Sequence, residues 1–138
     1  MECTIELTGP GTGKPTSFTY AQLKQMPMVR LDDVLQRMSH YPDQLTSWRG
    51  PSLEALLEAA EVKAGPLDIT LEATDGYRID CTRDDLRSAV VALQDGNGRW
   101  LTEVGNRCPL RLVPPHMPGN YWVANLRRIV AQPADDPI

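Results

Sequence analysis

Residues 48–81 read WRGPSLEALLEAAEVKAGPLDITLEATDGYRIDC, and this stretch contains the two clearest structural signals of the sequence. Its first half predicts a helix, because Ser52 is a favourable N-cap residue and apolar side chains then recur at helical spacing. The apolar stripe consists of Leu53, Leu56, Leu57 and Ala60. The helix is expected to end near Gly65 and Pro66, because proline cannot continue a helix and glycine favours its C-terminal end.

The second half of the same stretch predicts a β-hairpin. In LDITLEA, residues 67–73, every second side chain is apolar, which is the pattern of a strand with one buried face. Asp75 and Gly76 supply the turn. The same alternation continues beyond the turn through Tyr77, Ile79 and Cys81.

The residues before this stretch predict a first hairpin and a short helix. TIELT at 4–8 and SFTY at 17–20 are rich in threonine and in aromatic or β-branched residues, and they flank the turn-forming GPGTGKPT. Thr19 can cap a short helix that Pro27 terminates. Residues 28–38 are ambiguous, since MVRL could begin a strand, but the apolar spacing favours a helix. The residues on that helical face are Leu31, Val34, Leu35 and Met38.

The residues after this stretch predict one more helix and three strands. Thr82 and Asp85 form a capping-box pattern, which predicts a short helix over 83–88. The predicted strands are AVVAL at 89–93, PLRLV at 109–113 and LRRIVA at 126–131. The tail 132–138 is expected to be loosely held. Many short strands, three short helices and no internal repeat together indicate one α+β domain over residues 1–138.

Composition and charge exclude several classes of partner. The chain has 138 residues, of which 41% are hydrophobic and 23% charged, as expected for one domain with one core. Its net charge of -4 gives no electrostatic footprint for nucleic acid or for an anionic membrane and disfavours both partners. No run approaches the roughly 18 apolar residues of a membrane span, and the first residues lack a signal-peptide pattern. We expect a soluble, cytoplasmic protein, or a periplasmic one if a signal peptide was removed from an exported parent.

Common catalytic and metal-binding motifs are missing. Cys3, Cys81 and Cys108 are odd in number and have no CxxC spacing, so neither a disulfide framework nor a zinc site is indicated. The run GPGTGKPTS resembles a phosphate-binding loop, but Thr8 and Pro15 stand where that motif needs glycine and a hydroxyl residue. No serine lies in a GxSxG motif, and the two histidines have no metal-ligand spacing. Hydrolase and zinc-enzyme functions are therefore not supported.

Three linked segments carry a resemblance to a known family. They are WRGPSLEALL at 48–57, ATDGY at 73–77, and PLRLVP at 109–114 running into LRRI at 126–129. In this order they resemble the molybdopterin-binding domain of the sulfite oxidase family, which carries W-x-G-V-P-L-x-x-L-L, D-G-Y, and P-L-R-L-V-V-P followed by W-L-x-R-I. The resemblance covers most of the chain from about Gly9 to Val130 and implies an α+β fold with mixed sheets. It also implies a strand from about Met28 to Leu35, in place of the helix that the spacing favours.

The resemblance implies a pyranopterin-bound molybdenum whose protein ligand is a cysteine located between that strand and the W-x-G segment. The matching interval, residues 34–44, contains no cysteine, and none occurs anywhere between Thr4 and Asp80. Thiolate is a soft anionic ligand, and neither Ser39 nor His40 combines charge with softness. We therefore expect no bound molybdenum and assign no metal ligand and no catalytic residue.

The loop that anchors the cofactor also departs from the family pattern. Family members have approximately G-x-R-S-V-K-W-L, which holds the pterin phosphate through charge-assisted hydrogen bonds. The matching residues 119–126 read GNYWVANL, so that Tyr121, Trp122 and Ala124 replace the arginine, the serine and the lysine. A dianionic phosphate would lose its main partners.

Any bound ligand is expected to be molybdopterin or a small pterin-like aromatic molecule. The residues expected to contact it are His116, Asn120, Tyr121, Trp122 and His40. An alternative stays open, in which Tyr121 and Trp122 pack on the sheet and His116 is a surface loop residue. An anion site would also form if four arginines converged in the fold, and these are Arg37, Arg49, Arg111 and Arg128.

The functional expectation is a small module of the molybdopterin-binding type that lacks molybdenum redox chemistry. It would bind either a small aromatic ligand or a protein partner. The alternative is an enzyme, namely a minimal molybdenum-cofactor-dependent oxidoreductase that uses a noncysteine metal ligand such as Ser39 or His40.

Overall fold

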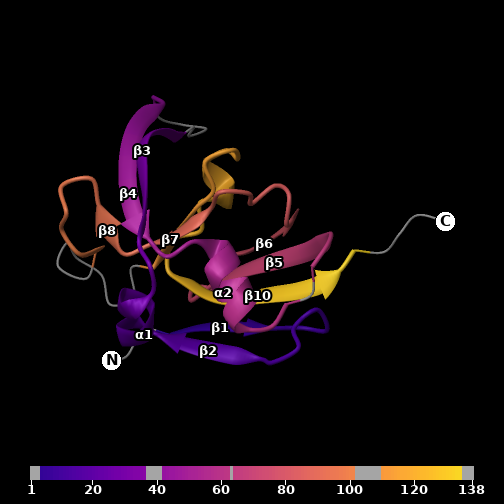
Figure 1. The fold of residues 1–138 in the computed structure, drawn as a ribbon. Helices are drawn as coiled ribbons and strands as arrows, with labels where there is room; N and C mark the ends of the chain where they lie inside the picture. Colours follow the sequence, from indigo (N-terminus) through magenta and orange to yellow (C-terminus); the bar gives the residue numbers. More distant parts are fainter. Residues whose placement is uncertain (1–3, 37–41, 63, 102–109, 135–138) are drawn as a thin grey trace.

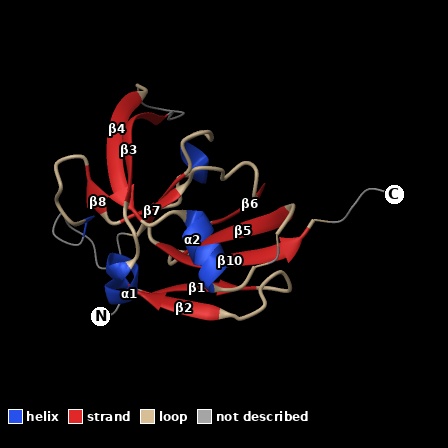
Figure 2. Cartoon of the chain, viewed as in Figure 1, coloured by secondary structure: helices blue, strands red, loops and turns tan. Residues whose placement is uncertain are grey.

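The computed structural model describes residues 4–36, 42–62, 64–101 and 110–134, and its largest unit is a five-stranded sheet (Figures 1 and 2). The strand order is β2-β1-β10-β5-β6. The strands are β1 (Thr4–Thr8), β2 (Thr16–Thr19), β5 (Leu67–Ala73), β6 (Arg78–Thr82) and β10 (Leu126–Pro133). Strands β1 and β10 are parallel, and the other neighbours are antiparallel.

Both predicted hairpins are confirmed, with differences at their ends. Strands β1 and β2 pair from Thr4 opposite Thr19, and β5 and β6 pair from Asp68 opposite Thr82. Every second side chain of β5 is buried, as the alternation predicted. The prediction that Tyr77 continues the buried face is wrong, because this residue precedes β6 and remains 43% exposed.

The C-terminal strand is longer than predicted. Strand β10 continues through Gln132 to Pro133, which lies opposite Leu67 of β5. The prediction of a loose tail from residue 132 is therefore wrong for its first two residues, and residues 135–138 lie outside the described part.

The two N-terminal helix predictions are confirmed with their caps. Helix α1 (Tyr20–Gln25) has a capping box at Thr19, and helix α2 (Leu53–Ala59) has Ser52 at its N-cap, whose Oγ accepts the Ala55 N–H at 3.1 Å. Helix α2 ends earlier than predicted, because Glu61 adopts a left-handed φ of 53°. Figure 1 shows α2 lying across the five-stranded sheet, where its buried leucines face the core.

The predicted helix over residues 83–88 does not form. The reciprocal bonds of the capping box are present, since Thr82 N donates to Asp85 and Asp85 N donates to Thr82 Oγ1. The segment then continues as successive turns and ends at Ser88, whose φ of 64° is incompatible with a right-handed helix. One turn is too short to propagate a helix once the chain reverses hand.

A second group of strands stands above the large sheet (Figure 1). Strands β3 (Val29–Gln36), β4 (Gln44–Gly50) and β8 (Gln94–Asp95) form one sheet, and β7 (Val90–Ala92) pairs with β9 (Arg111–Val113). Residues 29–36 are thus a strand, as the family resemblance implied, and the helix favoured by the spacing is wrong. The register shifts between Leu31 and Val34, and Asp33 has a φ of 53°, so that a β-bulge interrupts the alternation.

The two groups of strands enclose two apolar clusters. The larger cluster contains the buried faces of the five-stranded sheet and α2, including Leu7, Leu56, Leu71 and Ile129. The smaller cluster lies under β3 and β4 and contains Val34, Val90, Ala92, Val113 and Trp122. The loop that follows β9 therefore supplies a core residue to the upper group of strands, and this fixes the loop against the β3–β4 hairpin.

Candidate functional site

A small cavity lies where the end of β3 meets the loop after β9. It has a volume of about 210 Å³ and is lined by Leu35, Pro115, His116 and Met117. The end of β3 is the point after which the resemblance implies the metal ligand. His40 and Ser39 lie outside the described residues, so their predicted roles stay predictions.

The loop from Pro115 to Trp122 presents its predicted site residues in different ways. His116 is exposed and lines the cavity, whereas Asn120 is exposed on the short 3-10 helix η2 (Gly119–Tyr121). Tyr121 is half-buried against the larger cluster. The structure therefore brings His116 to a cavity and packs Tyr121 on the core. A ligand contact stays a prediction for His116, Asn120 and Tyr121.

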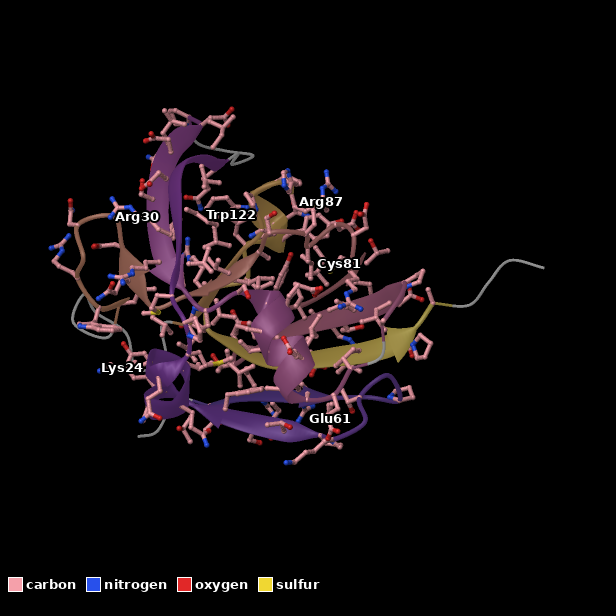
Figure 3. The ribbon with its side chains drawn as sticks, viewed as in Figure 1. Lys24, Arg30, Glu61, Cys81, Arg87 and Trp122 are labelled. Carbon is pink, nitrogen blue, oxygen red and sulfur yellow. The ribbon has the colours of Figure 1, made fainter. Side chains whose placement is uncertain are left out.

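Trp122 is a core residue in this structure. Its side chain is 4% exposed and lies beside the β3–β4 hairpin (Figure 3). The indole N–H donates to the Met117 carbonyl at 3.0 Å, and the ring meets Trp48 edge to face at a centroid distance of 6.4 Å. Because its only polar group is already bonded, Trp122 supports the cavity wall through Met117, and its direct contact with a ligand stays a prediction.

Arg111 is a half-buried cation near this aromatic pair. Its guanidinium carbon lies 5.5 Å from the centre of the Trp48 ring, and it has no hydrogen bond or ion pair to any residue that the structure describes. Burial lowers the pKa of this guanidinium from its usual value. The sequence signal for such a group is a charged residue inside the apolar run PLRLV.

The three arginines of the possible anion site that the structure describes do not converge. Arg128 lies in β10 of the large sheet and is paired with Glu6 at 3.0 Å and with Glu72 at 3.2 Å. Arg49 follows Trp48 in β4, so the two side chains point to opposite faces of that strand, and only the face of Trp48 meets Arg111. Arg37 lies outside the described residues.

The described residues offer no ligand set for a metal. No group of three histidine, cysteine or acidic side chains is close enough to hold a metal ion within residues 4–36, 42–62, 64–101 and 110–134. Cys81 is buried in β6, where its thiol donates to the Ile69 carbonyl at 3.6 Å. Burial, with smaller contributions from Asp85 and Asp80, raises the pKa of this thiol to about 12. Cys81 is thus a neutral core thiol, which is a poor ligand for molybdenum.

Stability at alkaline pH is expected to depend on Cys81. The pKa of this thiol is raised from 9.0 to about 12 in the folded protein, so the unfolded chain loses the proton first as the pH rises. The free energy of unfolding should therefore be unaffected by this thiol below pH 9 and should fall between about pH 9 and 12. Urea unfolding at stepped pH values tests this expectation. Cys81→Ala should show a shallower fall, and an equally steep fall in the variant would contradict the assignment.

A hydrogen bond links the loop to the β5–β6 turn. The Tyr77 hydroxyl donates to the backbone carbonyl of Asn120 at 2.8 Å, although the two residues are 43 positions apart. Tyr77→Phe is expected to lower the free energy of unfolding by about 0.5–1.5 kcal/mol and to speed amide exchange in residues 119–122. Tyr121→Phe is the matched control, since no hydrogen bond of its hydroxyl occurs in the described part of the chain. Equal exchange rates in the two variants would show that the link does not hold the loop.

Comparison with known proteins identifies the family to which this architecture belongs. Residues 2–137 match the model of the oxidoreductase molybdopterin binding domain, so the chain belongs to that family. A comparison with curated protein sequences finds no match. The crystal structure of the sulfane dehydrogenase SoxCD from Paracoccus pantotrophus shares the fold, with a TM-score of 0.78 and 21% sequence identity.

The match with SoxCD covers very different shares of the two chains. It covers 94% of this chain but only 38% of the SoxCD chain, so the present chain spans well under half of that neighbour. The likeness establishes the mixed-sheet molybdopterin-binding fold. Within the ranges that the structure describes, no helix is long and apolar enough to cross a membrane.

Proposed function

We propose that this chain is a binding module that holds a flat, pterin-like ring beside the end of β3 and performs no molybdenum redox chemistry. The observation that carries the proposal is the cavity lined by Leu35, Pro115, His116 and Met117. Three of these residues lie shortly before residues 119–126, which match the cofactor loop of the family. The surface that the cavity exposes is mostly polar, and the His116 imidazole offers both a ring that can stack on a pterin and a polar atom that can bond to its edge.

The metal-binding half of the family cofactor does not fit the residues that are described. Molybdenum in this fold is expected to need a thiolate at the end of β3, and the sequence has no cysteine between Thr4 and Asp80. Cys81 is neutral and buried in the large sheet. The proposal therefore includes no step at a metal.

The loop that matches the family's phosphate-binding loop also has no cationic side chain. Residues 119–126 contain no lysine or arginine. The cavity, at about 210 Å³, is smaller than the roughly 300–1,000 Å³ of sites that enclose a whole ligand. An uncharged ring with a short polar side chain thus matches the site better than a phosphorylated cofactor.

Neopterin, which is fluorescent and lacks a phosphate, is a suitable probe for this proposal. Titration followed by fluorescence anisotropy should show saturable binding, and His116→Ala should weaken it about tenfold by removing contact area and a polar partner. His40→Ala tests the second predicted histidine in the same way. Lys14→Ala, in the exposed β1–β2 connection, is the control and should bind like the original protein. Absence of saturable binding, or equal binding by His116→Ala, would overturn the proposal.

A second candidate function is the binding of a protein partner, and one observation favours it. Leu35 and Leu45 lie opposite each other near the end of the β3–β4 hairpin and are 40% and 67% exposed. An exposed apolar pair on a protruding hairpin is a frequent feature of docking surfaces. Leu45→Ser should then abolish co-purification with a partner while leaving neopterin affinity unchanged. Retention of the partner by this variant would contradict the candidate.

A further inference from the structure

A groove with a volume of about 490 Å³ lies at the other end of the β5–β6 hairpin. It is bordered by the start of β5, the turns that follow β6, and α2. Apolar atoms of Pro66, Leu67 and Ala134 line part of it. The volume lies within the range of about 300–1,000 Å³ that is typical of small-molecule sites.

One wall of the groove is fixed by a hydrogen-bond network. Arg83 donates to the Glu54 carboxylate through Nη2 at 2.8 Å and through Nε at 3.2 Å. Its Nη1 also donates to the Gly65 carbonyl at 3.2 Å. These bonds connect α2 to the residue after β6 and to the segment before β5. The wall of the groove is therefore fixed before a ligand binds, which is a form of preorganisation.

A second arginine presents unoccupied donors at the same groove. Arg87 Nη1 donates to the Asp84 carbonyl at 3.0 Å and lies 3.4 Å from the Asp84 carboxylate. Its Nε and Nη2 groups have no partner among residues 4–36, 42–62, 64–101 and 110–134. Figure 3 shows the Arg87 side chain reaching outward from the segment after β6. This edge of a guanidinium is a two-donor fork that matches a carboxylate.

Charge around the groove selects the kind of anion. Among the described lining residues, the two arginines are balanced by Glu54 and Asp84. A dianion such as a phosphate monoester would be repelled by these two carboxylates, and the groove has no surplus of positive charge to offset that repulsion. A monoanion can bind the free Nε and Nη2 edge of Arg87 while Nη1 keeps its weak contact with the Asp84 carboxylate, whose side chain is 88% exposed.

From this arrangement we propose that the groove is a second ligand site, which binds a small monocarboxylate with an apolar body. The carboxylate pairs with the free edge of Arg87, and the apolar body covers Pro66, Leu67 and Ala134. The site shares no lining residue with the His116 cavity. It lies at the end of the hairpin opposite to the Asp75–Gly76 turn, so its occupancy does not depend on the proposed pterin site.

The test is an NMR titration of the intact protein with phenylacetate, followed through its backbone amides. Phenylacetate should shift the amides of Gly65, Leu67, residues 82–88 and Ala134 in a saturable manner. It should leave the amides of the non-proline residues in 115–122 unchanged. Arg87→Gln should weaken the binding at least about tenfold, because it removes a charge-assisted pair of hydrogen bonds. Arg127→Gln, at an exposed position near the opposite end of β10, is the matched control and should not change it.

Two further ligands separate the contributions of charge and ring. Benzyl alcohol lacks the carboxylate, so it should bind to the original protein more weakly than phenylacetate does. Its affinity for Arg87→Gln should equal its affinity for the original protein. Phenyl phosphate should bind less tightly than phenylacetate. The proposal is overturned if phenylacetate causes no saturable shift at 65–67 and 82–88, if Arg87→Gln binds it normally, or if phenyl phosphate binds more tightly.

Discussion

Gly50→Ala is expected to leave the protein unfolded under conditions in which the original chain is folded. A Cβ atom at this position would overlap the carbonyl oxygen of Val91 and would lie 2.7 Å from its carbonyl carbon and 3.0 Å from the Cα of Ala92. These are backbone atoms and cannot rotate away. Val91 N is bonded to Pro51 O, and Leu93 N to Arg49 O, each at 2.8 Å, so separating the strands would break both bonds. The cost would be several kcal/mol, a large part of the roughly 5–15 kcal/mol that stabilises a domain.

Circular dichroism and thermal unfolding measure this effect, and Gly98→Ala provides its control. Gly98 has a φ of 78°, but a Cβ at that position meets nothing within 4 Å. The control should therefore keep its fold and lose only about 1–2 kcal/mol for the left-handed conformation of alanine. A melting temperature of Gly50→Ala close to that of Gly98→Ala would show that the close approach of the two strands is not required.

Trp122→Ala is expected to lower the free energy of unfolding by about 3–5 kcal/mol, because it removes a large buried side chain and leaves a cavity. The ring belongs to the smaller apolar cluster, is 4% exposed, and packs on Trp48. The substitution also removes the hydrogen bond from the indole N–H to the Met117 carbonyl. Urea unfolding followed by circular dichroism gives the change directly.

Asn120→Ala is the control for this second prediction, because Asn120 lies two residues away and contributes only its backbone carbonyl to the bond with Tyr77. Its cost should stay within about 0.5 kcal/mol, as for most surface substitutions. A small loss of stability in Trp122→Ala would instead favour the interpretation of this tryptophan as a ligand contact that the core does not need.

The strand β3 illustrates why local pattern and structure can disagree. Because of the bulge, the inward side chains of Leu31 and Val34 are three positions apart, whereas inward side chains of a regular strand are two positions apart. That spacing, followed by Leu35 and Met38, imitates the period of a helix. The pairing partner β4 decides the outcome, and pairing between strands is not encoded in the spacing of a single segment. The family resemblance identified the strand because it compares whole segments in order.

Local capping and turn signals were predicted more accurately than the length of elements. Thr19 and Ser52 cap their helices as expected, and the Asp75–Gly76 turn closes the second hairpin. The bonds at Thr82 were also correct, yet a left-handed Ser88 ends the segment before a helix can form. Capping patterns indicate where a helix can begin, but they do not determine whether its next turn is stabilised.

The sequence predicted which loop contains the candidate site, but it did not predict which side chains of that loop face the cavity and which face the core. The match of residues 119–126 to a family loop identified the region, and the structure locates a cavity beside His116, three residues before that match. The burial of Trp122 depends on β9 and also on β3 and β7, and the last two strands are distant in sequence. Position along the chain therefore could not show which aromatic residue faces the core.

The central claim is that this member of the molybdopterin-binding family binds a ring without a metal. The most direct test is to express the chain in a host that makes the molybdenum cofactor, purify it without chelators, and measure bound molybdenum by elemental mass spectrometry alongside pterin fluorescence. The account predicts far less than one equivalent of molybdenum, together with pterin fluorescence or saturable neopterin binding. Molybdenum near one equivalent would contradict it and would establish an oxidoreductase-type site with a noncysteine ligand.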